Sequence, residues 1–253
     1  MAARNWVLAV IVAAELTLPS SVCFAEPKIG NAVTINNEVE AVTAEGAQPL
    51  TTGSELYSNE LVRTGGGESM AQLLFLDNTN LSVGPGSTIR LDKFVYDPNG
   101  RSGSMILVAG RGAFRFITGL QDSKSYTIKT AYAAIGVRGT EFYVLVKDNE
   151  VQIQLIKGHV IVRTISQKVV LLEKPNVVLT VDSKGNISQL EIVNHPIVDL
   201  ANLGPPVTNY ASLFPPATNV ATGGDAYYVA GGLAALGGFI TLELFEHHKP
   251  ASP

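Results

Sequence analysis

The serines and carboxylates of this chain do not have the spacing of a catalytic site. The run at residues 100–104 (GRSGS) approaches the Gly-x-Ser-x-Gly pattern that exposes a nucleophilic serine, but Ser104 stands where the final glycine is needed. Asp148 and Glu150 flank a predicted hairpin turn, where carboxylates are normally solvated. We therefore expect no enzymatic activity.

The histidines offer a metal ion too few ligands. His159 stands alone beside a predicted turn, and we expect it at a surface position on a strand. Glu243 and His247 are four apart and could share one face of a helix, with His248 adjacent, but two or three ligands near the end of the sequence make a weak metal site. We expect neither a bound metal ion nor an organic cofactor.

Phosphate and nucleic-acid binding are not indicated either. The glycines at residues 65–67 lack the Lys-Ser/Thr pair and the helix of a phosphate-binding loop, so they predict a turn. The formal net charge is -4, and no run of basic residues occurs. Because nucleic-acid binding needs clustered Lys and Arg to neutralise phosphates, no nucleic-acid partner is expected.

One glycine-rich run has the composition of a structural corner or of a contact site. It reads Gly136, Val137, Arg138, Gly139, Thr140, Glu141, Phe142. Glycine allows sharp backbone turns with positive φ. Arg138 carries five N–H donors, which could bind backbone carbonyls at a strand crossing or could contact a partner. The sequence leaves both roles open.

The elements that would position these residues are short strands. From about residue 28 to 192 the sequence alternates β-like runs with turn signals, and no stretch has convincing helical periodicity. Residues 150–156 alternate polar and apolar side chains, as a half-buried strand does, and Lys157-Gly158 is expected to turn the chain into a second strand. Many short strands predict an all-β sandwich or roll over residues 26–195.

The first 25 residues have the pattern of a secretory signal peptide. Arg4 supplies a positive charge, and residues 6–14 (WVLAVIVAA) form an apolar run too short to span a bilayer. The small residue Ala25 precedes Glu26, so we expect cleavage between them. The protein is therefore expected to be exported to the periplasm or cell envelope.

Two further segments follow the predicted β domain. Residues 196–225 contain five prolines among Asn, Thr and Gly, and they are expected to form an extended linker. Residues 226–246 are apolar and carry small residues spaced four apart, within a C-terminal segment at 226–253. This apolar segment could be a membrane-associated or self-associating helix, a helix packed on the β domain, or disordered.

The order and spacing of several runs resemble the FecR-domain family over about residues 50–165. These runs are residues 53–65 (GSELYSNELVRTG), 71–81 (AQLLFLDNTNL), 112–119 (GAFRFITG), 126–130 (YTIKT) and 135–142 (IGVRGTEF). Two positions depart from the family pattern: Ala131 stands where proline is usual, and Asn78 stands where glycine is usual. The resemblance implies an extracytoplasmic β domain without catalysis.

The name-giving members of this family are single-span regulators. The resemblance implies a periplasmic domain that contacts the signalling domain of an outer-membrane siderophore receptor, and a cytoplasmic segment that controls a sigma factor. Here a predicted export signal precedes the domain. We therefore expect the domain to carry over, but not direct sigma-factor control.

Two functions follow as alternatives. In the first, the protein is a binding or signal-sensing module for a protein or glycan partner outside the cytoplasm, and residues 136–142 are a structural or partner-contact motif. In the second, it is a structural envelope protein, in which residues 226–246 drive anchoring or assembly through membrane contact or self-association.

Overall fold

The computed structural model describes residues 26–97, 99 and 102–207. In this part of the chain the regular elements are β-strands and two short 3-10 helices, so the predicted all-β class is confirmed. The predicted signal peptide, most of the predicted linker and the apolar segment 226–246 lie outside the described residues. Among the described residues, no helix has the length and apolar character to cross a membrane.

The elements have the following bounds: β1 (Lys28–Asn36), β2 (Val39–Thr43), β3 (Gly46–Pro49), β4 (Glu55–Tyr57), β5 (Leu61–Thr64), β6 (Met70–Phe75), β7 (Asn80–Val83), β8 (Thr88–Tyr96), β9 (Gly103–Ala109), β10 (Gly112–Ile117), η1 (Ser123–Ser125), β11 (Tyr126–Lys129), β12 (Ala133–Val146), β13 (Glu150–Thr164), β14 (Val169–Leu172), β15 (Val177–Asp182), β16 (Ile187–Ile192) and η2 (Ala201–Leu203).

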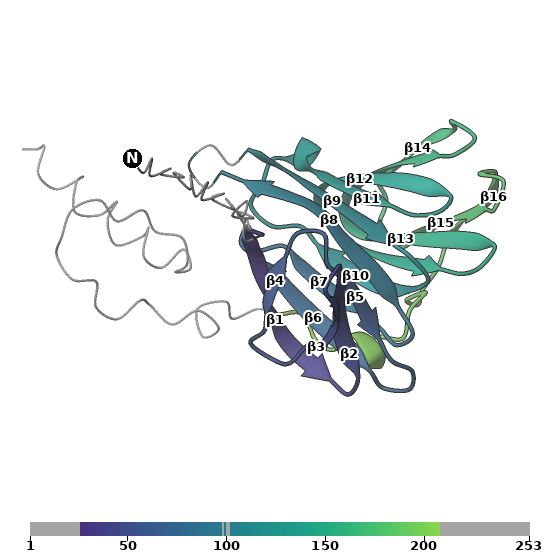
Figure 1. Ribbon diagram of the computed structural model, residues 1–253. Helices are drawn as coiled ribbons and strands as arrows, with labels where there is room; N and C mark the ends of the chain where they lie inside the picture. Colours follow the sequence, from purple (N-terminus) through teal and green to yellow (C-terminus); the bar gives the residue numbers. More distant parts are fainter. Residues whose placement is uncertain (1–25, 98, 100–101, 208–253) are drawn as a thin grey trace, which may run out of the picture.

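These strands hydrogen-bond into one continuous, curled sheet (Figure 1). The order along the sheet is β3-β2-β5-β8-β9-β11-β12-β10-β7-β6-β1-β4, and β13 to β16 branch from the other side of β12. The pairing of β9 with β11 is parallel, and the other pairings among the described strands are antiparallel.

The long hairpin of β12 and β13 joins two walls of this sheet. The first half of β12 pairs with β11 and the second half pairs with β10, while β13 runs along the opposite edge of β12. β13 pairs in turn with β15 through its first half and with β14 through its second half. We call the two sides the β11–β14 wall and the β10–β15 wall.

A bulge in the middle of this hairpin marks the change of partners. The register of β12 against β13 shifts between Arg138 and Glu141. Gly139 (φ 57°) and Gly158 (φ 87°) meet there, and a Cβ on Gly158 would lie 2.1 Å from the backbone oxygen of Gly139. The turn predicted at Lys157-Gly158 is therefore wrong, because β13 continues through these residues as a bulged strand.

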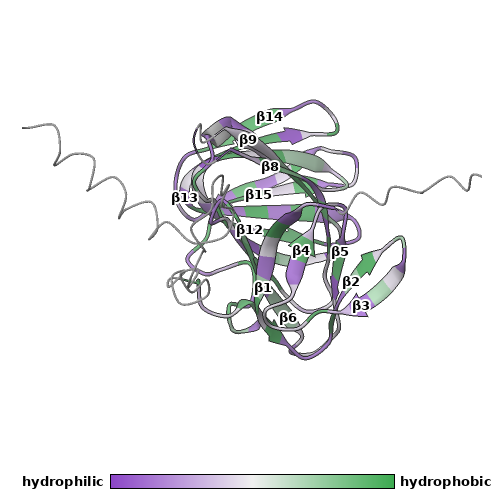
Figure 2. Ribbon diagram, turned by 60° about the vertical axis from the view of Figure 1, so that its left-hand side comes forward, coloured by the Kyte–Doolittle hydropathy of each residue, from purple (hydrophilic) through white to green (hydrophobic). Residues whose placement is uncertain are grey.

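The curled sheet encloses one main hydrophobic core. Apolar and polar residues alternate along its strands (Figure 2). In β8, for example, the buried Ile89 and Leu91 alternate with the exposed Arg90. Phe116 and Phe142 lie opposite each other on β10 and β12, and their rings stack with centroids 5.4 Å apart.

A buried carboxylate fixes the loop between β10 and β11. Asp77 is fully buried and accepts hydrogen bonds from the Thr79 backbone N–H (3.0 Å), the Thr79 hydroxyl (2.8 Å), Gln121 Nε2 (2.9 Å) and the Tyr126 hydroxyl (2.8 Å). Burial, reinforced by the charge of Asp77, raises the pKa of Tyr126, which keeps its hydroxyl protonated as a donor. The same loop carries Lys124.

Residues 195–205, which we call the strap, lie on the face of the β10–β15 wall that points away from the main core. A buried glutamine of β13 holds the start of the strap. Gln154 donates to the carbonyl of His195 (3.0 Å) and accepts from the backbone N–H of Ile197 (2.9 Å). The strap is therefore tied to the middle of the shared hairpin.

A second buried glutamine, on β6, holds the end of the strap. Gln72 donates to the carbonyls of Leu203 (3.2 Å) and Pro205 (2.6 Å). Between the two glutamines, Val198 and Leu203 pack with Tyr143 of β12 in a separate small core. The strap thus covers polar and apolar groups that would otherwise face water.

The strap extends the β domain beyond the boundary expected from the sequence. The sequence predicts that the domain ends at residue 195 and that a linker starts at 196. Instead, the domain extends to at least residue 205, because the strap's apolar side chains are buried and its carbonyls accept side-chain hydrogen bonds. Proline removes a backbone donor, but it leaves its own carbonyl free to accept.

Candidate binding surface

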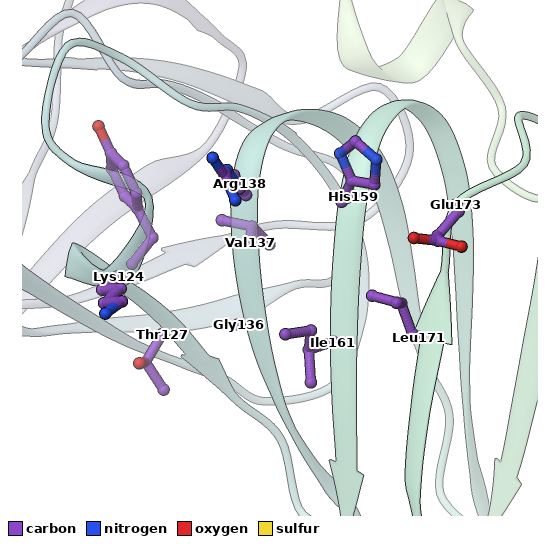
Figure 3. A pocket seen from close by; sticks show the side chains of 10 residues that line it. Lys124, Thr127, Gly136, Val137, Arg138, His159, Ile161, Leu171 and Glu173 are labelled. Carbon is purple, nitrogen blue, oxygen red and sulfur yellow. The ribbon is translucent and has the colours of Figure 1, made fainter.

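A hollow of about 580 Å³ opens on the outer surface of the β11–β14 wall (Figure 3). Two rows of cross-strand neighbours build it. Arg138 of β12 and His159 of β13 lie opposite each other in the first row. The second row consists of Thr127, Gly136, Ile161 and Leu171, one residue from each of the four strands.

Gly136 forms the floor of the hollow because it has no side chain. A Cβ placed on Gly136 would have the backbone oxygen of Ile161 as its nearest neighbour, at 3.9 Å, and the φ of Gly136 is not in the left-handed region. Neither packing nor backbone geometry therefore requires glycine here. A glycine inside a strand often marks a place where another molecule or backbone approaches closely.

The rim of the hollow carries basic side chains without acidic partners. Lys124, Arg138 and His159 are exposed, and none of them belongs to an ion pair among the described residues. Glu173 is the one carboxylate of the lining, and it lies on the far side of His159 from Arg138 (Figure 3). The local charge is therefore positive in a chain of net charge -4.

Aliphatic side chains form one wall of the hollow. Ile161 and Leu171 lie opposite each other on β13 and β14, and each is 52% exposed. They stand between Gly136 and the open edge of the sheet at β14 (Figure 3). Half-exposed aliphatic groups beside unpaired cations give this surface both apolar and electrostatic means of binding.

The corner of the family motif is held by Thr140, not by Arg138. The Thr140 hydroxyl accepts from the backbone N–H of Arg138 (3.0 Å) and donates to the carbonyl of His159 (2.9 Å), while its backbone N–H donates to the Thr118 hydroxyl (2.8 Å). The Arg138 guanidinium makes no hydrogen bond among the described residues and is exposed at the hollow. Of the two roles that the sequence leaves open for Arg138, the hydrogen bond to backbone carbonyls does not occur among the described residues.

The remaining motif residues have different surroundings. Val137 and Phe142 are buried in the main core, and Glu141 sits where the register shifts. Gly136 and Arg138 are therefore the motif residues that offer most to a partner. A contact role for the motif stays a prediction.

Comparison with known proteins identifies the domain. Residues 60–161 match the family model described as FecR protein. The chain carries a FecR domain. The match spans β5 to β12 and most of β13, and it therefore includes both rows of the hollow except Leu171. No curated protein matches the chain.

Solved structures give a weaker likeness. Two crystal structures of a "putative anti-sigma factor" from Parabacteroides distasonis match at 21% and 20% identity, with TM-scores of 0.41 and 0.40. They cover 52% and 51% of this chain. The chain in turn covers 60% and 59% of theirs, so it spans less than two thirds of these proteins.

Sequence reasoning missed the aliphatic wall of the FecR domain's hollow. The run at residues 160–162 is continuously apolar, and the structure buries Val160 and Val162 while Ile161 faces outward. Because strand side chains alternate between faces, an unbroken apolar run could have indicated that one member faces out. His159 lies exposed on a strand, as predicted. Among the described residues, no group of His, Cys, Asp and Glu could hold a metal ion.

We expect Thr140→Ala to destabilise the FecR domain by about 1–3 kcal/mol, because it leaves the Arg138 N–H and the His159 carbonyl without their hydroxyl partner. Arg138→Ala should change the free energy of unfolding by less than about 0.5 kcal/mol, as is usual for an exposed side chain. Thr140→Ser keeps the hydroxyl and serves as the control. Urea unfolding measures all three, and a larger loss from Arg138→Ala than from Thr140→Ala would contradict this assignment.

Proposed function

We propose that this protein is an exported, non-enzymatic envelope protein, whose FecR domain binds a partner outside the cytoplasm as a signal-sensing module. The observation that carries the proposal is the hollow on the β11–β14 wall. Unpaired basic groups, half-exposed aliphatic groups and a glycine floor come together there, on a surface that includes Gly136 and Arg138 of the family motif. Such a combination fits recognition of another molecule.

Export is supported by the sequence of the first 25 residues, which combines a basic start, a short apolar run and Ala25 before Glu26. The FecR match supports a regulatory domain of the extracytoplasmic kind. We propose the periplasm or the cell envelope as the location, with the mature protein beginning at Glu26.

A structural role in the envelope is the second candidate. It is supported by the apolar composition and the small residues spaced four apart in the segment at 226–246, which suit close helix packing in a membrane or between copies. The two candidates differ in what removal of this segment does. A fragment ending at residue 207 should keep its partner if the FecR domain is the binding module, and should lose its assembly if the segment is the functional part.

Capture from an envelope extract tests the proposed function. The immobilised full chain is compared with a Lys124→Glu, Arg138→Glu double variant and with Lys28→Glu, which reverses a surface charge on β1, five strands along the sheet from β11. We expect the double variant to lose the captured partner and Lys28→Glu to retain it. Equal capture by all three proteins would show that the hollow is not the binding surface.

A further inference from the structure

We propose that the hollow binds a partner protein through an acidic, extended segment, which places a large apolar side chain over Gly136 and a carboxylate beside Arg138. This inference rests on the proposed function and names the chemistry of the partner. Three observations support it: the glycine at position 136, which the fold does not require; the net positive charge of the rim; and the lack of exposed Phe, Tyr or Trp side chains among the described lining residues.

Gly136 is a glycine for which the fold itself gives no reason. It lies inside β12, where a side chain would strengthen the strand. A Cβ on Gly136 would come no closer than 3.9 Å to another atom, so a side chain has room there. Gly139 and Gly158, in the same hairpin, have positive φ values that account for their presence. The empty position at Gly136 leaves a recess between Thr127 and Ile161, and a side chain from another molecule can fill it.

The rim selects the charge of that molecule. Lys124, Arg138 and His159 surround the recess and form no ion pair among the described residues, and Glu173 lies beside His159 on the side away from Arg138 (Figure 3). Arg138 stands two residues after Gly136 and is exposed to solvent. Its planar guanidinium suits a carboxylate. Charge complementarity therefore favours an acidic segment.

The lining favours a protein over a glycan. Tyr126 is the one Phe, Tyr or Trp among the described lining residues, and it is only 3% exposed, with its hydroxyl donating to Asp77. Apart from the imidazole of His159, no exposed ring among the described lining residues is therefore available for a sugar or a base to stack on. The exposed apolar groups are instead Ile161 and Leu171, which suit an aliphatic or aromatic side chain.

The test uses the full chain and two short synthetic peptides. One peptide has Asp-Phe-Glu between Gly-Ser flanks, and the other has Lys in place of Asp and Glu. Binding is measured by fluorescence anisotropy at low and high salt. We expect the acidic peptide to bind at least about tenfold more tightly than the basic one. We expect this difference to shrink as salt screens the exposed charges.

Two variants and their controls separate the parts of the inference. Gly136→Val should keep or raise the midpoint of thermal unfolding, yet weaken binding of the acidic peptide by about tenfold or more, because its side chain fills the recess. Gly66→Val is its control, since Gly66 also has open space and no positive φ. Arg138→Glu should reverse the preference toward the basic peptide, whereas Lys28→Glu, on the distant strand β1, should not.

The possible outcomes decide between this inference and the broader proposal. Equal binding of the two peptides, or unchanged binding by Gly136→Val, overturns the inference. Binding to alginate or to vesicles containing phosphatidylglycerol, without binding of the acidic peptide, also overturns it. In each of these cases the proposed function survives if capture of the envelope partner still depends on Lys124 and Arg138. It fails separately if capture is indifferent to both.

Discussion

A FecR-domain fragment that ends at residue 194 is expected to be about 4–6 kcal/mol less stable than one that ends at residue 207. The shorter fragment loses the burial of Val198 and Leu203, each of which contributes about 1.5–3 kcal/mol, and leaves Gln72 and Gln154 without their backbone partners. For a domain of this size, the loss corresponds to a fall of roughly 10–20 °C in the midpoint of thermal unfolding. Differential scanning calorimetry of both fragments provides the measurement.

Single substitutions check that the strap is the cause. Gln72→Ala and Gln154→Ala in the longer fragment should each cost about 1–3 kcal/mol, because the strap's backbone groups lose their partners. Gln48→Ala, at an exposed position of β3, is the matched control and should have almost no effect. If the fragment ending at residue 194 melts at the same temperature as the longer one, the strap does not contribute to the stability of the domain.

Asp77→Ala is expected to cost about 3–5 kcal/mol of unfolding free energy, because several buried donors lose their acceptor at about 1–3 kcal/mol each. The substitution removes the acceptor for Thr79, Gln121 and Tyr126 together. Urea unfolding followed by circular dichroism measures the loss. Lys124 sits in the loop that Asp77 anchors, so binding at the hollow should weaken as well.

The control for this change is Asp97→Ala. Asp97 is exposed and accepts one local hydrogen bond, from the backbone N–H of Asn99 (2.9 Å), so its loss should cost less than about 0.5 kcal/mol. Tyr126→Phe should fall between the two, since it removes one donor from the network. Equal stability of Asp77→Ala and Asp97→Ala would show that the buried carboxylate does not organise the loop.

Much of the fold could be predicted because strand periodicity is local. The alternation in residues 150–156 predicts the first half of β13, and the structure confirms it. The continuation of β13 through Gly158 could not be predicted in the same way. It depends on Gly139 of the partner strand, which allows two glycines to form a bulge where a single sequence signal indicates a turn.

For the candidate site, too, local features could be predicted from the sequence and contacts between distant residues could not. The sequence singled out the motif at residues 136–142, and the structure places Gly136 and Arg138 of that motif at the hollow. It could not show that Leu171 would stand opposite Ile161, because cross-strand register is not a local property. The role first considered for Arg138 belongs to Thr140, whose short side chain reaches both the Arg138 N–H and the His159 carbonyl.

The strap also sets the order in which this domain can be completed. Gln72 and Leu203 are 131 residues apart in sequence, and contacts between such distant residues form slowly because the intervening chain must first be closed into a loop. A chain synthesised from its N-terminus delivers β6 long before residue 203. Until the strap docks, Gln72, Gln154 and Tyr143 remain exposed to water. The described domain therefore cannot complete its packing until the strap has been synthesised, and a chaperone could bind the chain throughout that interval.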